Sequence, residues 1–386
     1  MSDYIGVYIH IPFCRRRCIY CDFTVIDTNN KVVPNLFETY TNCLNTEISL
    51  RFNHIQNVRN IKDIKTLYLG GGTPSFIGTE FLKDILENVY RFVSPSQLVE
   101  TTIEVNPEDV SYEFSKFLVD YGISRVSLGI QSMDDECLKM LSRRNSREMN
   151  ERAIKTLQDS GIENINCDVI FGIPNSQSSQ VIRTLEELVR FDIKHISAYS
   201  LTVEEYTPLH LMVSRNIITT KEDVDKEFIE IHSFLTSSGF EHYEISNYSK
   251  IGYESKHNLL YWNRNEYIGL GLGAWGFIEN RRYQNEFRFR LYKDKLEMGE
   301  LPTIFGENID NHKSFEEIVM LGFRTRDGIK LDETRKHLDA FSFNKFLKEI
   351  KKFEGEFLEV RDGRVIPTIK GWLFSDYIVS SLISVV

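Results

Sequence analysis

The chain has 386 residues, of which 41% are apolar and 26% are charged, as in an ordinary globular protein. This length exceeds one compact core and predicts two or three domains. The net charge of −10 disfavours a generic binder of polyanions such as nucleic acids, and no run of eighteen apolar residues is present that could span a membrane.

A loop with three cysteines follows the first predicted strand, residues 5–11. Cys14, Cys18 and Cys21 have the spacing Cys-x3-Cys-x2-Cys. Cuboidal four-iron clusters normally take four thiolates, and this loop supplies only three. One iron would then lack a protein ligand, and an open metal position usually binds a substrate or cofactor. The spacing therefore predicts a 4Fe-4S cluster with one open iron.

A structural zinc site is the main alternative at this loop. Zinc would need four closed ligands, and His10 on the preceding strand and Asp22 beside the last cysteine are poor candidates for the fourth. A disulfide framework is disfavoured because the remaining cysteines are scattered along a long chain, at Cys43, Cys137 and Cys167.

Short apolar runs alternate with amphipathic segments over the first 200 residues. Strands are predicted at residues 5–11, 66–69, 101–105, 125–129, 165–171 and 195–201. Helices are predicted at residues 33–51, 79–93, 111–121, 134–141, 147–160 and 178–191. Six consecutive βα units imply a parallel sheet, whereas a closed eight-stranded barrel would need two more units. We therefore predict an α/β fold, an open partial (β/α)6 barrel.

Polar residues lie where these predicted strands end, and ligands of parallel α/β folds gather at the carboxyl ends of the strands. The second strand is followed by Gly-Gly-Gly-Thr-Pro at residues 70–74, in which glycines allow close backbone approach to a ligand. The segment could equally form a plain tight turn, and single carboxylates or a lone arginine could be surface groups. The other candidates are Glu104, Gln131, Arg143, Asp168, Tyr199 and Thr202.

Seven segments together resemble the radical S-adenosylmethionine (SAM) family that contains the oxygen-independent coproporphyrinogen III oxidases and the haem chaperone HemW. They read YIHIPFCRRRCIYCDF, LYLGGGTPS, IEVNPE, RVSLGIQSM, NCDVIFGIP, HNLLYW and YIGLGLGAWGF. They follow one another in order over about the first 280 residues. In this family the open iron is chelated by SAM. The resemblance implies that Cys14, Cys18 and Cys21 hold the cluster.

The resemblance also implies contacts to SAM. For the SAM at the cluster, the corresponding positions are Tyr8, Gly71, Gly72, Thr73 and Glu104. Oxidase members hold a second SAM, whose contacts correspond to Tyr20, Gln131, Arg143, Asp168, Thr202 and Trp275. The sequence leaves open whether this chain has one SAM site or two.

Three features favour the chaperone branch over the oxidases. Oxidases have a fourth cysteine two positions after the third, where this chain has Phe23, and they carry an N-terminal arm before the first strand. Residues 257–262 (HNLLYW) resemble the HNxxYW motif that is associated with haem binding in the chaperones, which makes His257 a candidate haem ligand. From residue types alone, His257 and Trp262 could instead pack at a domain junction. The resemblance thus implies a haem chaperone that delivers haem, as cargo, to apo-haemoproteins such as respiratory enzymes. The alternative is a coproporphyrinogen III oxidase, and enzyme activity stays open.

The sequence after residue 220 predicts a barrel extension and a small C-terminal domain. A helix at 221–238, a strand at 240–245 and a glycine-rich segment at 269–276 are followed by helices at 312–322, 331–338 and 343–353, strands at 357–361 and 364–367, and a helix from residue 369. The last part is mainly helical and winged-helix-like, and the negative net charge of the whole chain disfavours a DNA reader. We expect domains at 1–220, 221–305 and 306–386.

The two ends of the sequence give expectations about where the protein is located and whether it contacts a membrane. Residues 1–4 carry no basic segment followed by an apolar one, so we expect no secretory signal and a cytoplasmic protein, whose reducing surroundings suit free thiolates. Residues 377–386 are too short to span a membrane but could dock on its surface. A homodimer is left open.

Overall fold

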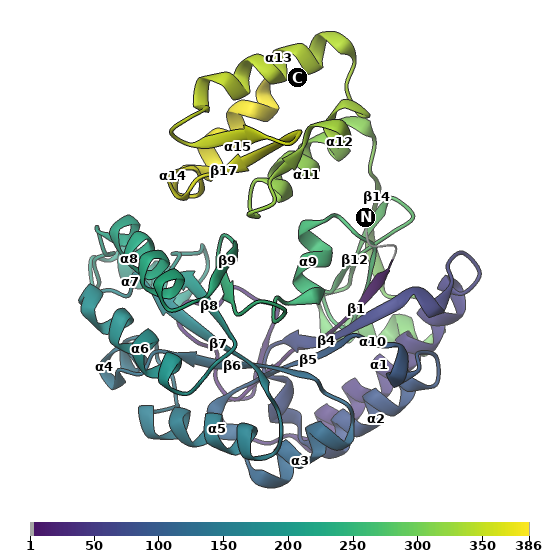
Figure 1. The fold of residues 1–386 in the computed structure, drawn as a ribbon. Coiled ribbons are helices and arrows are strands. Elements are labelled where there is room, and N and C mark those ends of the chain that lie inside the picture. Colours follow the sequence, from purple (N-terminus) through teal and green to yellow (C-terminus); the bar gives the residue numbers. More distant parts are fainter. Residues whose placement is uncertain (1–3, 386) are drawn as a thin grey trace.

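The structure is a computed structural model, and it describes residues 4–385 (Figure 1). Residues 1–3, part of the N-terminal stretch considered above, and residue 386, the end of the predicted docking segment, lie outside the described residues. Between residues 4 and 385, no helix is long and apolar enough to cross a membrane.

Six parallel strands form the centre of the molecule. In sheet order they are β1 (Ile5–Ile11), β4 (Ile64–Gly71), β5 (Glu100–Val105), β6 (Arg125–Gln131), β7 (Asn164–Phe171) and β8 (His195–Ser200). Each neighbouring pair runs parallel. Over the described residues β1 and β8 do not pair with each other, because other strands take their outer edges. The predicted open, partial (β/α)6 barrel is confirmed.

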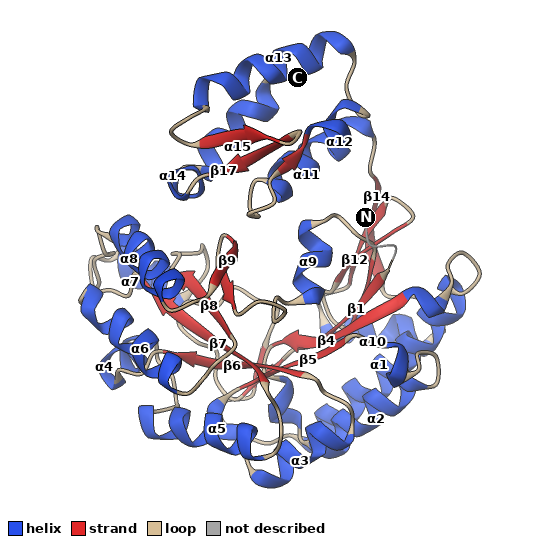
Figure 2. Ribbon diagram, in the orientation of Figure 1, coloured by secondary structure: helices blue, strands red, loops and turns tan. Residues whose placement is uncertain are grey.

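Helices cover the outer, convex face of this curved sheet (Figure 2). They are α1 (Pro34–Ile55), α2 (Thr79–Tyr90), α3 (Tyr112–Asp120), α4 (Asp135–Met140), α5 (Arg147–Asp159) and α6 (Ser178–Arg190). Each amphipathic helix buries one apolar stripe, as α2 does with Leu82, Ile85, Leu86 and Val89. The apolar residues that alternate along these strands, such as Val126, Leu128 and Ile130 of β6, are buried in the main hydrophobic core. All six helices lie where they were predicted, within a few residues.

The sheet extends beyond the barrel at both edges, and of the added strands the sequence analysis predicted only β9 (Glu241–Glu244), at residues 240–245. On one side β11 (Tyr267–Leu270) lies parallel to β1, and the antiparallel strands β12 (Trp275–Ile278), β13 (Arg281–Asn285) and β14 (Thr303–Asn308) follow. On the other side β10 (Asn247–Ser249) pairs with β8, and β9 (Glu241–Glu244) pairs with β10. Within the glycine-rich segment, a Cβ on Gly269 would lie only 1.7 Å from the Trp275 carbonyl oxygen, so β11 and β12 can approach this closely only with glycine there. The helices of this region are α7 (Pro208–Ser214), α8 (Val224–Ser237), α9 (Lys256–Trp262) and α10 (Phe289–Glu297).

A buried carboxylate ties α1 to the extension. Glu47 is fully buried and accepts hydrogen bonds from the Gly271 N–H (2.8 Å), the Asn285 amide (2.6 Å) and the Tyr292 hydroxyl (2.7 Å). Arg51 lies 3.7 Å away on the same helix. The carboxylate therefore satisfies donors from β13, α10 and the turn after β11.

Glu47→Ala is expected to lower the free energy of unfolding by about 3–5 kcal/mol, because it leaves buried donors without an acceptor and removes the carboxylate beside the Arg51 charge. Urea denaturation of the apoprotein measures the effect. Glu38→Ala, at an exposed position of the same helix, is the control and should change stability by less than about 0.5 kcal/mol. Equal stability of the two variants would show that the Glu47 network contributes nothing.

The C-terminal part lies above the open side of the barrel in Figure 1 and has a hydrophobic cluster of its own. It contains α11 (Asn311–Gly322), β15 (Ile329–Lys330), α12 (Leu331–Arg335), α13 (Ala340–Phe353), β16 (Leu358–Arg361), β17 (Arg364–Pro367), α14 (Ile369–Leu373) and α15 (Ser375–Ser384). Its three strands pair in the order β15-β17-β16. Arg264 and Arg282 of the extension both form ion pairs with Glu317 on α11, at 2.6 Å each. The predicted helices and the two strands of the predicted wing are present, and β15 adds a third strand that was not predicted.

Candidate functional site

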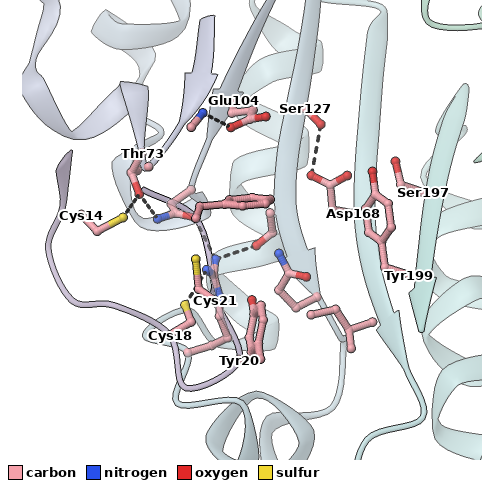
Figure 3. Close-up of a pocket in the computed structure, with 18 of the residues that line it drawn as sticks. Cys14, Cys18, Tyr20, Cys21, Thr73, Glu104, Ser127, Asp168, Ser197 and Tyr199 are labelled. Atoms are coloured by element: carbon pink, nitrogen blue, oxygen red, sulfur yellow. Dashed lines mark hydrogen bonds between the residues drawn. The ribbon is translucent and has the colours of Figure 1, made fainter. Parts of the chain in front are cut away.

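A cavity of about 410 Å³, here called the barrel cavity, opens at the carboxyl ends of the parallel strands. The cysteine loop forms one wall, and Glu104, Asp168 and Tyr199 lie across from it (Figure 3). The cavity brings together most of the predicted site residues, namely Cys14, Cys18, Tyr20, Cys21, Gly71, Gly72, Thr73, Glu104, Gln131, Arg143, Asp168 and Thr202. These residues are far apart in the sequence and meet because their strands are neighbours in one sheet.

Short backbone pairings shape the cysteine loop. β2 (Phe13–Cys14) lies parallel to β3 (Ile26–Asp27), and the Thr28 N–H donates to the Cys14 carbonyl oxygen at 3.0 Å. The Cys21 N–H donates to the Cys18 carbonyl oxygen at 3.3 Å. These bonds close the loop around the space in which its three thiols face the cavity (Figure 3).

The donor set of this loop fits a four-iron cluster. Burial, with smaller contributions from the neighbouring Cys21 and Cys18, raises the pKa of the Cys14 thiol to about 12, so three thiolates this close need positive charge between them. Bound iron would supply that charge, since a coordinating thiol is deprotonated by its metal. Nowhere in residues 4–385 do three His, Cys, Asp or Glu side chains converge on one ion position. A cluster does not require such convergence, because each thiolate binds a different iron.

Two further side chains contact the cysteine sulfurs. The Thr73 hydroxyl donates to Cys14 Sγ at 3.6 Å, and Arg143 Nη1 donates to Cys18 Sγ at 3.6 Å. Arg143 Nη2 also donates to the Asn106 side chain (2.8 Å) and the Gly129 carbonyl oxygen (2.9 Å), which fixes the guanidinium in the cavity wall. Thiolates are stabilised by such donors.

The glycine-rich turn after β4 allows the chain to pass close to the cysteine loop. Gly71 has φ +112°, and a Cβ on Gly72 would lie 2.7 Å from the Pro12 carbonyl carbon. The Gly72 N–H donates to the Ile11 carbonyl oxygen at 2.8 Å. A side chain at position 72 would therefore separate the turn from the loop.

Two half-buried carboxylates lie on the wall opposite the cysteines. Glu104 accepts hydrogen bonds from the Tyr68 hydroxyl and the Gly71 N–H, both at 2.9 Å. Asp168 accepts from the Ser127 hydroxyl at 3.1 Å and from the Asn166 amide at 2.8 Å. Burial raises the pKa of Glu104 to about 7, and burial also raises the pKa of Asp168.

The raised pKa of Glu104 predicts a specific pH dependence of stability. Between its usual pKa of 4.5 and about 7, the folded apoprotein binds more protons at Glu104 than the unfolded chain does. The free energy of unfolding should therefore fall as pH rises through this window, and the slope should be shallower in Glu104→Gln. Urea denaturation between about pH 5 and pH 8 tests this. Burial also raises the pKa of Glu244 to about 7. Glu244 therefore contributes to the slope of the unfolding free energy against pH in both the wild type and the variant. Identical slopes would contradict the prediction.

Three predicted site residues lie outside the barrel cavity. The Tyr8 hydroxyl is hydrogen-bonded to His10 Nδ1 at 3.0 Å beside the cavity. Trp275 lies on the extension, 41% exposed, with its ring centroid 5.7 Å from that of Phe305. Their roles in binding SAM stay predictions.

His257, the third of these residues, is buried at the start of α9. Its Nδ1 is 2.8 Å from the Thr66 hydroxyl and its Nε2 is 2.7 Å from the Tyr261 hydroxyl, so both ring nitrogens have partners. Burial, with a smaller contribution from the positive charge of Arg125, lowers its pKa to about 3, which keeps the ring neutral. Binding iron would require α9 to move and one of these bonds to break, so ligation of haem by His257 also stays a prediction.

Several lining residues escaped the sequence analysis, namely Tyr68, Asn106, Arg125, Ser127, Asn166, Ser197 and Asn258. A signal for some of them was available. Arg125 and Ser127 are polar residues at alternate positions of an otherwise apolar strand, as are Asn166 and Asp168. In a strand, such alternation places side chains on one face, here the inner face of the barrel.

Comparisons with family models agree with this arrangement. A model of the radical SAM superfamily matches residues 8–188, and a model of the HemN C-terminal domain matches residues 309–374.

Curated relatives cover most of the chain. The haem chaperone HemW of Bacillus subtilis (strain 168) is 33% identical over 327 residues, which are 84% of each chain. HemW of Lactococcus lactis subsp. lactis (strain IL1403) is 31% identical over 354 residues, 91% of this chain and 87% of the relative. HemW of Escherichia coli (strain K12) is 33% identical over 278 residues, 71% and 70% of the two chains.

One solved structure is similar over the whole fold. The coproporphyrinogen III oxidase HemN from Escherichia coli, a radical SAM enzyme, superposes with a TM-score of 0.83 and covers 100% of this chain and 92% of its own. The identity is 17%, so this likeness shows the fold alone.

Proposed function

The chain belongs to the radical SAM superfamily and, within it, to the HemW family, and from this premise we propose that it is a haem chaperone. In this proposal it binds haem as cargo, carries a 4Fe-4S cluster and SAM, and delivers haem to apo-haemoproteins such as respiratory enzymes. The observation that carries the proposal is the identity of about one third to HemW proteins over most of both chains.

The residues of the barrel cavity support the proposed cofactors. Cys14, Cys18 and Cys21 would hold the cluster, and a cluster so held supplies a redox-active iron centre with one position open to SAM. The turn of Gly71, Gly72 and Thr73 lies against the cysteine loop and would place backbone and hydroxyl groups beside SAM. Glu104 faces the cysteines across the cavity and would hold SAM from the other side. The remaining proposed SAM contacts are Tyr8, Tyr20, Gln131, Arg143, Asp168, Thr202 and Trp275.

The proposal keeps the three-part division into residues 1–220, 221–305 and 306–386. The separate hydrophobic cluster of the last part, with Phe315, Phe346 and Leu382, supports the second boundary. A cytoplasmic location, a homodimer and a surface contact with the membrane belong to the same proposal.

Phe23 supports a chaperone over a coproporphyrinogen III oxidase. Its ring is 62% exposed at the wall of the barrel cavity, at the position where the resemblance places a fourth cysteine in oxidases. The chain therefore lacks a thiol at that point of the cavity, while it keeps the three that would bind the cluster.

Haem titration of the full chain tests the proposal. We expect the wild type to bind haem with one saturating change in the Soret band. His257→Ala should weaken binding by about tenfold if the imidazole ligates iron. Tyr261→Phe is the matched control, because it frees His257 Nε2 from the same buried hydrogen bond without removing the ring, and it should bind haem at least as tightly as the wild type.

The outcomes of this titration separate two claims. Equal haem affinity of His257→Ala and the wild type would remove His257 from the haem site but leave the chaperone proposal intact. The absence of saturable haem binding by the wild type would contradict the chaperone proposal itself.

A further inference from the structure

A buried arginine faces the barrel cavity from the end opposite to the cysteines. Arg125 is the first residue of β6, paired in register with Thr102 on β5 and Asn164 on β7. The residues at the other end of β6, Gly129 and Gln131, lie at the level of the cysteine loop. Arg125 therefore extends from the floor of the barrel.

The guanidinium of Arg125 lacks the partners that a buried cation needs. The residue is only 2% exposed, yet it lines the cavity. Within residues 4–385, its Nε has no hydrogen-bond partner. Buried charges in proteins are normally paired, because removing an ion from water is costly.

The two carboxylates of the cavity are held by other donors. Glu104 is bonded to the Tyr68 hydroxyl and the Gly71 N–H, and Asp168 is bonded to Ser127 and Asn166. Burial raises the pKa of both groups, whereas the positive charge of Arg125 acts to lower the pKa of each. The arginine therefore contributes a positive field to the cavity floor without being paired there by a direct bond to Glu104 or Asp168.

A carboxylate from a bound ligand fits this position. A guanidinium offers a planar fork of N–H donors that matches the two oxygens of a carboxylate. In a cavity shielded from water, such a pair is stronger than at the surface. Two ligands of this cavity would bring carboxylates, namely SAM through its methionine part and haem through its propionates.

We propose that Arg125 anchors a propionate of bound haem at the floor of the barrel cavity. This inference rests on the proposed haem-binding function and adds the contact that recognises the cargo. The cysteine loop would hold SAM's carboxylate at the cluster, and Arg125, at the opposite end of β6, would remain for the propionate.

The test compares haem with haem dimethyl ester, in which both propionates are blocked, on the full chain after anaerobic cluster reconstitution. The wild type should bind haem about tenfold more tightly than the diester. Arg125→Gln should lose this preference while its affinity for the diester stays unchanged. Arg125→Lys keeps the charge but loses the planar fork of N–H donors, so it should retain part of the preference for haem over the diester. It replaces the glutamine variant if that variant does not fold.

Arg16→Gln is the matched control, since Arg16 lines the mouth of the same cavity. It should keep the full preference for haem over the diester. Loss of the preference in Arg16→Gln but not in Arg125→Gln would move the carboxylate contact to the mouth and overturn the inference. An equal affinity of the wild type for haem and diester would also overturn it.

SAM binding, measured by equilibrium dialysis, distinguishes the two carboxylate sources. Arg125→Gln should bind SAM as the wild type does. A loss of SAM affinity with an unchanged haem preference would assign Arg125 to SAM and overturn the inference, while leaving haem binding in place. If the wild type bound neither porphyrin, the haem function itself would fail, an outcome distinct from all of these.

Discussion

Cys18→Ser, purified and reconstituted without oxygen, is expected to lose the visible absorption and the acid-labile sulfide of a four-iron cluster completely. The loop contributes three thiolates, and the proposed cluster has no other protein ligand in the barrel cavity. With two thiolates left, two of the four irons would be without a protein ligand. Iron and sulfide analysis together with the absorption spectrum measures the loss.

Cys43→Ser is the control for this variant. Cys43 is a buried cysteine of α1 that packs in the main hydrophobic core and does not line the cavity. Its iron and sulfide contents should equal those of the wild type, even if stability falls slightly. Stoichiometric zinc without sulfide in the wild type would instead support a zinc site and contradict the cluster.

Gly72→Ala is expected to abolish cluster incorporation and to destabilise the apoprotein by about 3 kcal/mol. A Cβ at this position would lie 2.7 Å from the Pro12 carbonyl carbon and 2.8 Å from the Phe13 carbonyl oxygen. Both contacts are with backbone, so no side chain can move aside. The turn after β4 would have to shift away from the cysteine loop, which would break the 2.8 Å bond from Gly72 to Ile11.

Gly78→Ala separates this steric effect from backbone strain. Gly78 has φ +92°, but its Cβ would meet no heavy atom within 4 Å. Alanine there should cost about 1–3 kcal/mol through the strained positive-φ backbone alone and leave cluster incorporation intact. Denaturation and iron content measure both variants. Wild-type iron content in Gly72→Ala would contradict the proposed role of the close approach.

The barrel could be predicted from the sequence because its signals are local. The strands read as short runs rich in apolar residues, and helices begin at residues whose side chains cap them, as Ser111 does for α3 and Ser146 for α5. The extension β11–β14 could not be predicted in this way. Its strands are short and mix polar with apolar residues, and they are stabilised by long-range contacts such as those of Glu47 with Asn285 and Tyr292.

The candidate site was predictable where its residues are close in sequence. The three cysteines of the loop, and the turn that contains Thr73, carry their pattern within a few positions. The position of His257 depends instead on how α9 packs against β1 and β4, which no local pattern shows. The burial of its ring against Thr66 and Tyr261 therefore emerged only from the structure.

For Trp275 and Arg125, the structure differs from what the sequence analysis expected. Trp275 was expected at a SAM site because of its motif, but it lies on an extension strand whose position in the sheet was not anticipated. Arg125 was read only as the start of a strand, although its alternation with Ser127 places both side chains on the inner face of the barrel. For both residues, the possible role depends on where the strand lies in the sheet and on which way the side chain points.

The most direct test of the chaperone assignment is one anaerobic incubation of the cluster-reconstituted protein with haem, coproporphyrinogen III, SAM and a reductant, followed by chromatography of the tetrapyrroles. The account predicts that haem co-elutes with the protein and that coproporphyrinogen III is recovered unchanged. Conversion of coproporphyrinogen III to protoporphyrinogen over many turnovers, with haem left unbound, would contradict it.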